Sequence, residues 1–236
     1  MSDDLAARAA GIGALAEPVR TDLYRYVSGE PDAVSREQAA AALDVPLHTA
    51  KFHLDRLVEE GLLDVEFRRL TGRSGPGAGR PSKLYKRSDK ELSVSLPERR
   101  YDLAGKILAH AVDRAAVEDV PVGDAVREAA EDQGRLVGRA VRPRPKAHER
   151  SMRRASEALA GQGYEPRERD DELVLTNCPF DALVHEHTAL VCGLNEAFVS
   201  GVLEGAECRG LSACLDPEEG LCCVRVRPVD PSESAR

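Results

Sequence analysis

The 236-residue sequence has no tryptophan, and aromatic residues make up only 4% of it. Its core must therefore consist mainly of Ala, Leu and Val. It also lacks any apolar run of about eighteen residues, the length a membrane-spanning helix needs. The first residues are acidic where a signal peptide would be positively charged. These absences predict a cytoplasmic protein with no membrane partner.

Several sequence motifs that are typical of enzymes and redox proteins are also absent. There is no glycine-rich phosphate loop, no serine-hydrolase elbow and no C-x-x-C pair, so we expect no enzymatic activity. Cysteine is absent from the first 177 residues, and the six cysteines that follow are Cys178, Cys192, Cys208, Cys214, Cys222 and Cys223. Without a secretion signal, metal, cluster or redox chemistry explains them better than disulfides do.

Charge is unevenly distributed along this chain of net charge −8. Residues 1–88 are neutral overall, yet the segment 67–88 carries seven basic residues and no acidic one. A concentrated basic segment in an acidic protein favours a local nucleic-acid contact surface, although a solvated loop would look the same.

Residues 10–88 show the element order of a winged helix-turn-helix domain. Ser35 and Gln38 form a capping box, which marks a helix start, and Gly61 follows the last helix as a stop signal. Helices are expected over 17–27, 35–43 and 47–60, and strands over 62–69 and 82–86, with a Gly/Arg loop at 71–80 between the strands.

The helix over 47–60 has one apolar face, formed by Leu47, Ala50, Leu54, Leu57 and Val58. The opposite face and the hairpin supply the candidate DNA-binding residues: His48, Thr49, Lys51, Phe52, His53, Arg56, Arg73, Arg80 and Lys83. Imidazole and hydroxyl groups can hydrogen-bond base edges, and Phe52 can contact a thymine methyl group. A surface helix that binds a protein instead of DNA is the alternative.

We expect an α+β protein with three regions. The winged helix-turn-helix (10–88) is followed by central dimerisation helices (95–161) and by a small α+β sensor domain that contains the cysteines (162–229). DNA-reading helices of this kind usually work as a two-fold pair. The predicted partners are therefore a second copy of the chain and double-stranded DNA with a pseudo-palindromic operator.

The cysteines are widely spaced, unlike the closely paired ligands of zinc knuckles. Cys178 should follow a strand and Cys192 should lie in a helix. Cys222 and Cys223 are expected on the final strand, where alternation would let only one of them face a given site. Zinc, a thiol redox switch and plain burial remain alternatives, with burial favoured for Cys214.

Two further alternatives involve nearby groups. His185 or His187 could supply a ligand beside Cys178. Cys178 could also be a reactive thiolate at a helix N-terminus, with His185 as its partner in a thiol enzyme.

Two stretches of sequence resemble a known family. HTAKFHLDRLVEEGLL followed by GRPSKLYKRS resembles the ArsR-like winged-helix regulators, and the surroundings NCPF, VCGLN and CCVRV resemble their SufR branch of iron–sulfur repressors. The resemblance implies a [4Fe–4S] cluster bound by Cys178, Cys192 and Cys222 or Cys223, with Cys208 as a further candidate. It also implies a repressor whose cluster-loaded form binds DNA more tightly.

Overall fold

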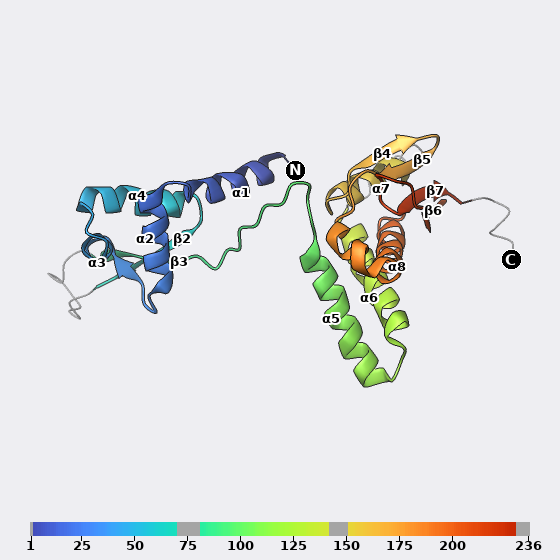
Figure 1. Ribbon diagram of the computed structural model, residues 1–236, viewed down its shortest axis with the longest axis horizontal. Helices are drawn as coiled ribbons and strands as arrows, with labels where there is room; N and C mark the ends of the chain where they lie inside the picture. The colour runs from blue at the N-terminus through green and yellow to red at the C-terminus, as the bar shows by residue number, and fades with distance from the viewer. Residues whose placement is uncertain (1, 70–80, 142–150, 230–236) are drawn as a thin grey trace. The chain divides into compact units, whose positions relative to one another are not determined.

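The computed structural model describes residues 2–69, 81–141 and 151–229, and the chain divides into two compact units, residues 1–94 and 95–236 (Figure 1). The expected regions 95–161 and 162–229 thus lie in the same unit. The candidate residues Arg73 and Arg80 fall outside the described residues.

The first unit is built on helices whose starts are capped. Glu17 accepts hydrogen bonds from the amides of Val19 and Arg20, and the capping box between Ser35 and Gln38 is present as expected. The helices are α1 (Ser2–Ala14), α2 (Pro18–Gly29), α3 (Arg36–Ala42) and α4 (Leu47–Glu59). The helix α1 is additional to those expected.

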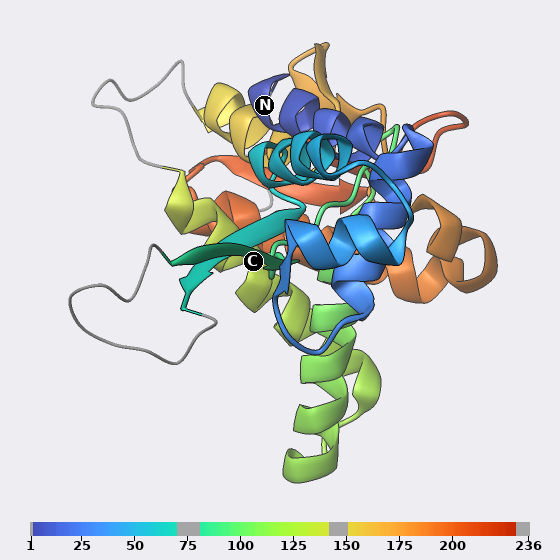
Figure 2. The same cartoon turned by 90° about the vertical axis from the view of Figure 1, so that its left-hand side faces the viewer.

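A small antiparallel sheet completes the first unit, in the order β1-β3-β2. Its strands are β1 (Val34–Ser35), β2 (Leu63–Arg68) and β3 (Ser82–Arg87). The β2–β3 hairpin, called the wing below, was expected; the two-residue β1 was not. Figure 2 shows the two wing strands side by side, both leading to the residues drawn in grey.

The core of the first unit buries Leu54 and Leu57 of α4 against Leu23 of α2 and Tyr85 of β3. Leu47 was expected on this buried face, but 46% of it is exposed. A helical side chain covers the turn that precedes its own Cα, and Leu47 begins the helix, so no preceding turn brings it onto the core.

The second unit combines long helices with a four-stranded antiparallel sheet in the order β4-β5-β7-β6. Its elements are α5 (Tyr101–Glu118), α6 (Val122–Ala140), α7 (Ser151–Ala160), β4 (Pro166–Arg169), β5 (Glu172–Leu175), α8 (Asp181–Gly205), β6 (Leu211–Leu215) and β7 (Val224–Pro228). One hydrophobic core joins helices and sheet. No helix among the described residues is long and apolar enough to cross a membrane.

Helices α6 and α8 pack backbone to backbone through glycines. A Cβ atom added at Gly134 of α6 would lie 2.1 Å from the carbonyl oxygen of Phe198, and one added at Gly201 of α8 would lie 2.2 Å from that of Glu131. This contact fixes the C-terminal part of α8. The helix departs from helical geometry at His187 (φ −131°, ψ 44°), before the turn that carries Cys192.

Candidate functional site

The N-terminal half of α4 presents a polar surface to solvent. His48, Lys51 and Phe52 are exposed, Phe52 by 65%, and Thr49 is half-buried beside them. Because the opposite face of α4 is anchored in the core, these side chains are held on a rigid element. Their hydrogen-bonding, cationic and apolar groups are the types that contact base edges and phosphates.

Three other candidate residues, two on α4 and one on β3, are held by neighbours within the chain. His53 Nδ1 lies 3.4 Å from Arg20 Nε and 3.5 Å from Glu17 Oε2, so its ring is turned toward α2. Arg56 pairs with Glu59 and Glu60 on its own helix. The residues before His53, by contrast, are the exposed ones on this part of α4.

The third is Lys83, which joins the wing to α4. Its ammonium group donates to Asp55, and the Tyr85 hydroxyl donates to the same carboxylate at 2.8 Å. Burial alone would raise the pKa of Asp55, but these two hydrogen bonds lower it below its usual value. The charged Asp55 thus fixes the wing against the helix.

A second site lies in the unit formed by residues 95–236, where four thiols from three segments meet. Cys178 lies between β5 and α8, Cys192 lies on α8, and Cys222 and Cys223 precede β7. Cys178 and Cys223 lie close enough to Cys222 for each to shift its pKa, and Cys192 lies close enough to Cys223 to do the same. We call these four residues the thiol cluster.

The expectation that Cys222 and Cys223 lie on a strand with opposite orientations is wrong. β7 begins at Val224, and the two cysteines form an irregular turn before it. The amide of Cys222 donates to Leu175 O, and the Asp216 amide donates to Cys223 O, each at 2.8 Å. Without strand alternation, both thiols can enter one cluster.

Charge is shared unequally within the thiol cluster. The neighbouring thiols of Cys178 and Cys223 lower the pKa of Cys222. The proximity of Cys222 raises the pKa values of Cys178 and Cys223, and burial raises them further. The opposite directions of these shifts show that the thiols influence one another, and the thiolate is the form in which cysteine binds metals.

The segment that carries Cys178 is fixed by Arg99. Its guanidinium donates to the Cys178 carbonyl oxygen at 2.9 Å, to Asp181 at 3.2 Å and to the Asn177 side chain. The Asn177 amide in turn donates to the carbonyl oxygens of Glu98 and Gly163. Backbone and side-chain contacts therefore position the first thiol before any ligand binds.

The other candidate ligands lie apart from the thiol cluster. Cys208 Sγ lies 3.8 Å from the carbonyl oxygen of Ala206, and its pKa is raised by burial. Cys214 is on β6, where its thiol lies 3.8 Å from Arg225 O. His185 and His187 are exposed on α8. None of these four groups is among the neighbours named as shifting the pKa values of Cys178, Cys222 and Cys223.

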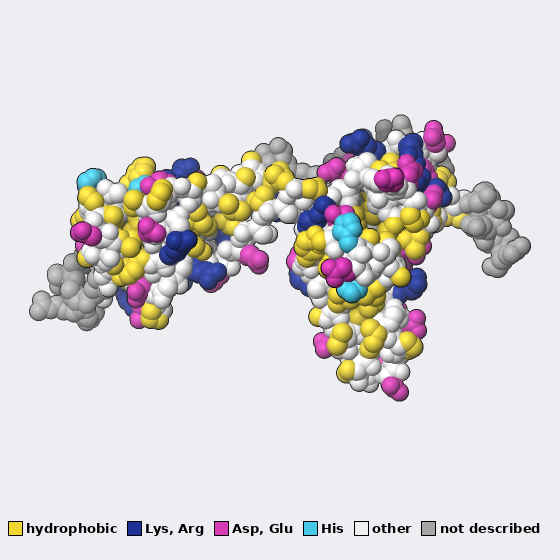
Figure 3. Space-filling model, viewed as in Figure 1, with side chains coloured by type: hydrophobic (Ala, Val, Ile, Leu, Met, Phe, Trp, Pro, Cys, Tyr) yellow, Lys and Arg dark blue, Asp and Glu magenta, His cyan; other side chains and the backbone are white. Residues whose placement is uncertain are grey.

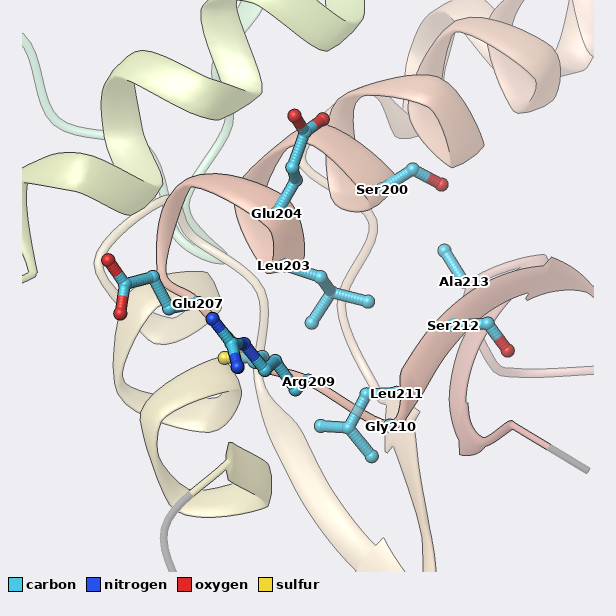
Figure 4. Close-up of a pocket in the computed structure, with 10 residues that line it drawn as sticks. Ser200, Leu203, Glu204, Glu207, Arg209, Gly210, Leu211, Ser212 and Ala213 are labelled. Atoms are coloured by element: carbon cyan, nitrogen blue, oxygen red, sulfur yellow. The ribbon is translucent and has the colours of Figure 1, made fainter. Parts of the chain in front are cut away.

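Cys208 instead lines an open pocket between the end of α8 and β6. In Figure 4, Ser200, Leu203 and Glu204 on α8 lie across from Ser212 and Ala213 on the strand. The pocket mixes charged, polar and apolar groups.

Two polar residues next to the thiols were not expected from the sequence. The Asn195 amide donates to Cys222 Sγ at 3.1 Å, and the Tyr164 hydroxyl donates to Asn195 Oδ1. Burial, together with the neighbouring Cys222, raises the pKa of Tyr164 well above its usual value. The sequence did offer one signal for Asn195, because an asparagine is unusual within the mostly apolar stretch VCGLNEAF.

Thiolates that converge from several segments are the kind of ligand that iron–sulfur clusters use. Four thiols converge from three segments, and Asn195 adds an N–H donor to one sulfur, as is common around metal-bound cysteines. Among the described residues, no group of three or more His, Cys, Asp or Glu side chains is placed so that it could hold a metal ion.

Comparison with known families matches residues 15–66 to a helix-turn-helix domain. No curated protein and no solved structure matches the chain. The matched segment contains α2, α3 and α4 and most of β2, and the match indicates a DNA-binding transcription regulator of the winged helix-turn-helix type. It ends before the unit that holds the thiol cluster.

Proposed function

We propose that this protein is a transcriptional repressor whose affinity for DNA is set by an iron–sulfur cluster bound to Cys178, Cys192, Cys222 and Cys223. The observation that carries the proposal is the meeting of four thiols from three segments in a chain that also has a helix-turn-helix domain. The resemblance of NCPF, VCGLN and CCVRV to the SufR branch supports the same reading.

The chain's own residues supply most of what such a site needs. Arg99 positions the backbone at Cys178, the hydrogen bond to Leu175 O positions Cys222, and α8 carries Cys192. A bound cluster would supply sensitivity to iron supply or oxidants. Tying three segments together would make the unit more rigid, and a tenfold change in DNA affinity needs only about 1.4 kcal/mol of coupling.

The test is anaerobic reconstitution of the full chain with iron and sulfide, followed by selection of sequences from a random duplex DNA library. We expect iron and sulfide in the wild type, and a lower Kd for selected DNA in the loaded form. Cys178→Ser and Cys192→Ser should lose the cluster, whereas Cys208→Ser and Cys214→Ser should retain it. Full loading of a Cys178, Cys192 double variant would overturn the ligand assignment.

The contacts among thiols also favour a second candidate, a redox switch. Oxidation of Cys178 and Cys222 by peroxide would form one S–S bond, with two electrons and two protons passing to the peroxide to give two waters. In that case, purified protein would contain no iron or sulfide, and mass spectrometry would find a Cys178–Cys222 disulfide that appears as DNA binding changes.

We also propose that the protein works as a homodimer joined through α5. Tyr101, Leu108 and Val112 follow heptad spacing along this helix. Val112 is 59% exposed, and Tyr101 is exposed as well. Figure 3 shows hydrophobic side chains gathered over α5 and α6. A second copy would cover this stripe and pair two reading helices on a pseudo-palindromic operator.

A further inference from the structure

Three buried polar groups form a hydrogen-bonded chain that ends on a sulfur of the thiol cluster. Tyr164, Asn195 and Cys222 are only 2%, 1% and 3% exposed. The Tyr164 hydroxyl donates to Asn195 Oδ1, and Asn195 Nδ2 donates to Cys222 Sγ at 3.1 Å. The three residues come from the segment before β4, from α8 and from the turn before β7.

Packing alone does not account for an asparagine at position 195. Its neighbours on α8, Leu194, Ala197 and Phe198, are all buried in the apolar core. A buried amide is costly unless both its ends are hydrogen-bonded, and an aliphatic side chain would fill the same space. The amide is satisfied only because Tyr164 and Cys222 lie at its two ends.

The donor and acceptor at each step from Tyr164 to Cys222 bear on whether the Cys222 sulfur carries a proton. With its oxygen occupied by the Tyr164 hydroxyl, Asn195 turns its N–H toward Cys222. A protonated thiol could equally donate to an amide oxygen, but a metal-bound thiolate has no proton and can only accept. The observed orientation needs no proton on Cys222, so it can persist when the sulfur binds a metal.

We propose that Asn195 is a positioning residue for Cys222, held in its donating orientation by Tyr164, and that its N–H···S hydrogen bond raises the reduction potential of the bound cluster. The inference rests on the proposed function. Hydrogen bonds to ligand sulfurs stabilise the more negative, reduced state, which is one way a protein sets cluster potential. On reduction the added electron goes to the cluster, and the amide proton stays on Nδ2.

The test is a dithionite redox titration of the reconstituted full chain. Asn195→Leu keeps the side-chain volume but removes the donor, and Tyr164→Phe keeps the ring but frees the amide. We expect Asn195→Leu to lower the reduced-to-oxidised ratio at a fixed potential about tenfold, which is about 59 mV for a one-electron couple. Tyr164→Phe should also lower the reduced-to-oxidised ratio, but by less than tenfold.

Ser200→Ala is the matched control, because Ser200 is on the same helix but lines the pocket of Figure 4. It should leave the potential unchanged. An unchanged potential in both Asn195→Leu and Tyr164→Phe, with full iron and sulfide loading, would overturn the inference while leaving the proposed function intact.

A second measurement needs no cluster. In the ¹⁵N-labelled apo protein, the Asn195 side-chain amide protons should exchange slowly with solvent and should shift in both Tyr164→Phe and Cys222→Ala. Rapid exchange, with no shift in either variant, would overturn the hydrogen-bonded chain. A wild-type chain that takes up no iron and sulfide would overturn the proposed function, and this measurement would still decide whether the hydrogen-bonded chain exists.

Discussion

His48 and Lys51 are exposed on α4 and have different chemistry toward DNA. We predict that His48→Ala relaxes the sequence preference recovered from a random library, because an imidazole can hydrogen-bond base edges. Lys51→Ala should instead weaken binding to all sequences, because a phosphate contact carries no base information. The slope of log K against log salt should become shallower by about 1 for Lys51→Ala.

Arg153→Ala is the control for this pair, since it removes one exposed positive charge from α7, outside the helix-turn-helix domain. It should leave both preference and salt slope unchanged. If Lys51→Ala also leaves the slope unchanged, α4 does not contact phosphate through this residue.

We predict that Glu218 makes a contribution to the free energy of unfolding that is lost in acid. Hydrogen bonds from Arg169 and Arg225 lower its pKa from 4.5 to about 2. Because the pKa is lower in the folded state, this contribution is present above about pH 4.5 and is lost as the pH falls toward 2. We expect urea unfolding midpoints at pH 6 and pH 3 to differ less in Glu218→Gln than in the wild type.

Glu168→Gln on β4 is the matched control, because Glu168 is exposed and makes no ion pair with any residue that the structure describes. Its difference between pH 6 and pH 3 should equal that of the wild type. An equal difference in Glu218→Gln would show that the two arginines do not act on this carboxylate in solution.

Among the secondary-structure elements, the contact of α6 with α8 is the least tolerant of added volume. Gly134→Ala would place a methyl group 2.1 Å from Phe198 O, so the helices must separate. We predict a loss of about 1–3 kcal/mol in the free energy of unfolding, measured by urea denaturation. Gly123→Ala, on the same helix with open space around it, should be neutral or stabilising by about 0.5–1 kcal/mol.

The elements that could be predicted from sequence carry local signals. The capping box at Ser35 and the stop at Gly61 mark α3 and α4, and apolar spacing gave the buried residues Leu54 and Leu57. Leu47 was misplaced because periodicity ignores where a helix begins. The two-residue β1 was missed because it forms only by pairing with β3.

In the thiol cluster, too, local features could be predicted from the sequence, whereas contacts between distant segments could not. The position of Cys178 after a strand and that of Cys192 in a helix follow from local pattern. The turn at Cys222 and Cys223 depends instead on distant backbone partners, Leu175 O and the Asp216 amide. The contact of Asn195 with Cys222 joins residues far apart in sequence, so no local signal could predict the pairing.

At the scale of the whole molecule, the exposed polar surface of α4 and the thiol cluster lie in different compact units. The proposed effect of a cluster on DNA affinity must therefore pass from one unit to the other. The proposed α5 contact belongs to the same unit as the thiol cluster. It would let changes around Cys192 alter how two copies present their α4 helices.

The dimer can be tested with two valines on α5. Val112 lies in line with Tyr101 and Leu108, whereas Val117 is also exposed but points about 140° away around the helix at 100° per residue. Val112→Glu would bury an unpaired charge in the contact, which is strongly unfavourable. We predict a monomer at micromolar concentration in sedimentation velocity and weaker operator binding, because each copy then reads one half-site alone. Val117→Glu should remain dimeric with unchanged affinity, and a wild-type chain that sediments as a monomer would refute the proposed contact.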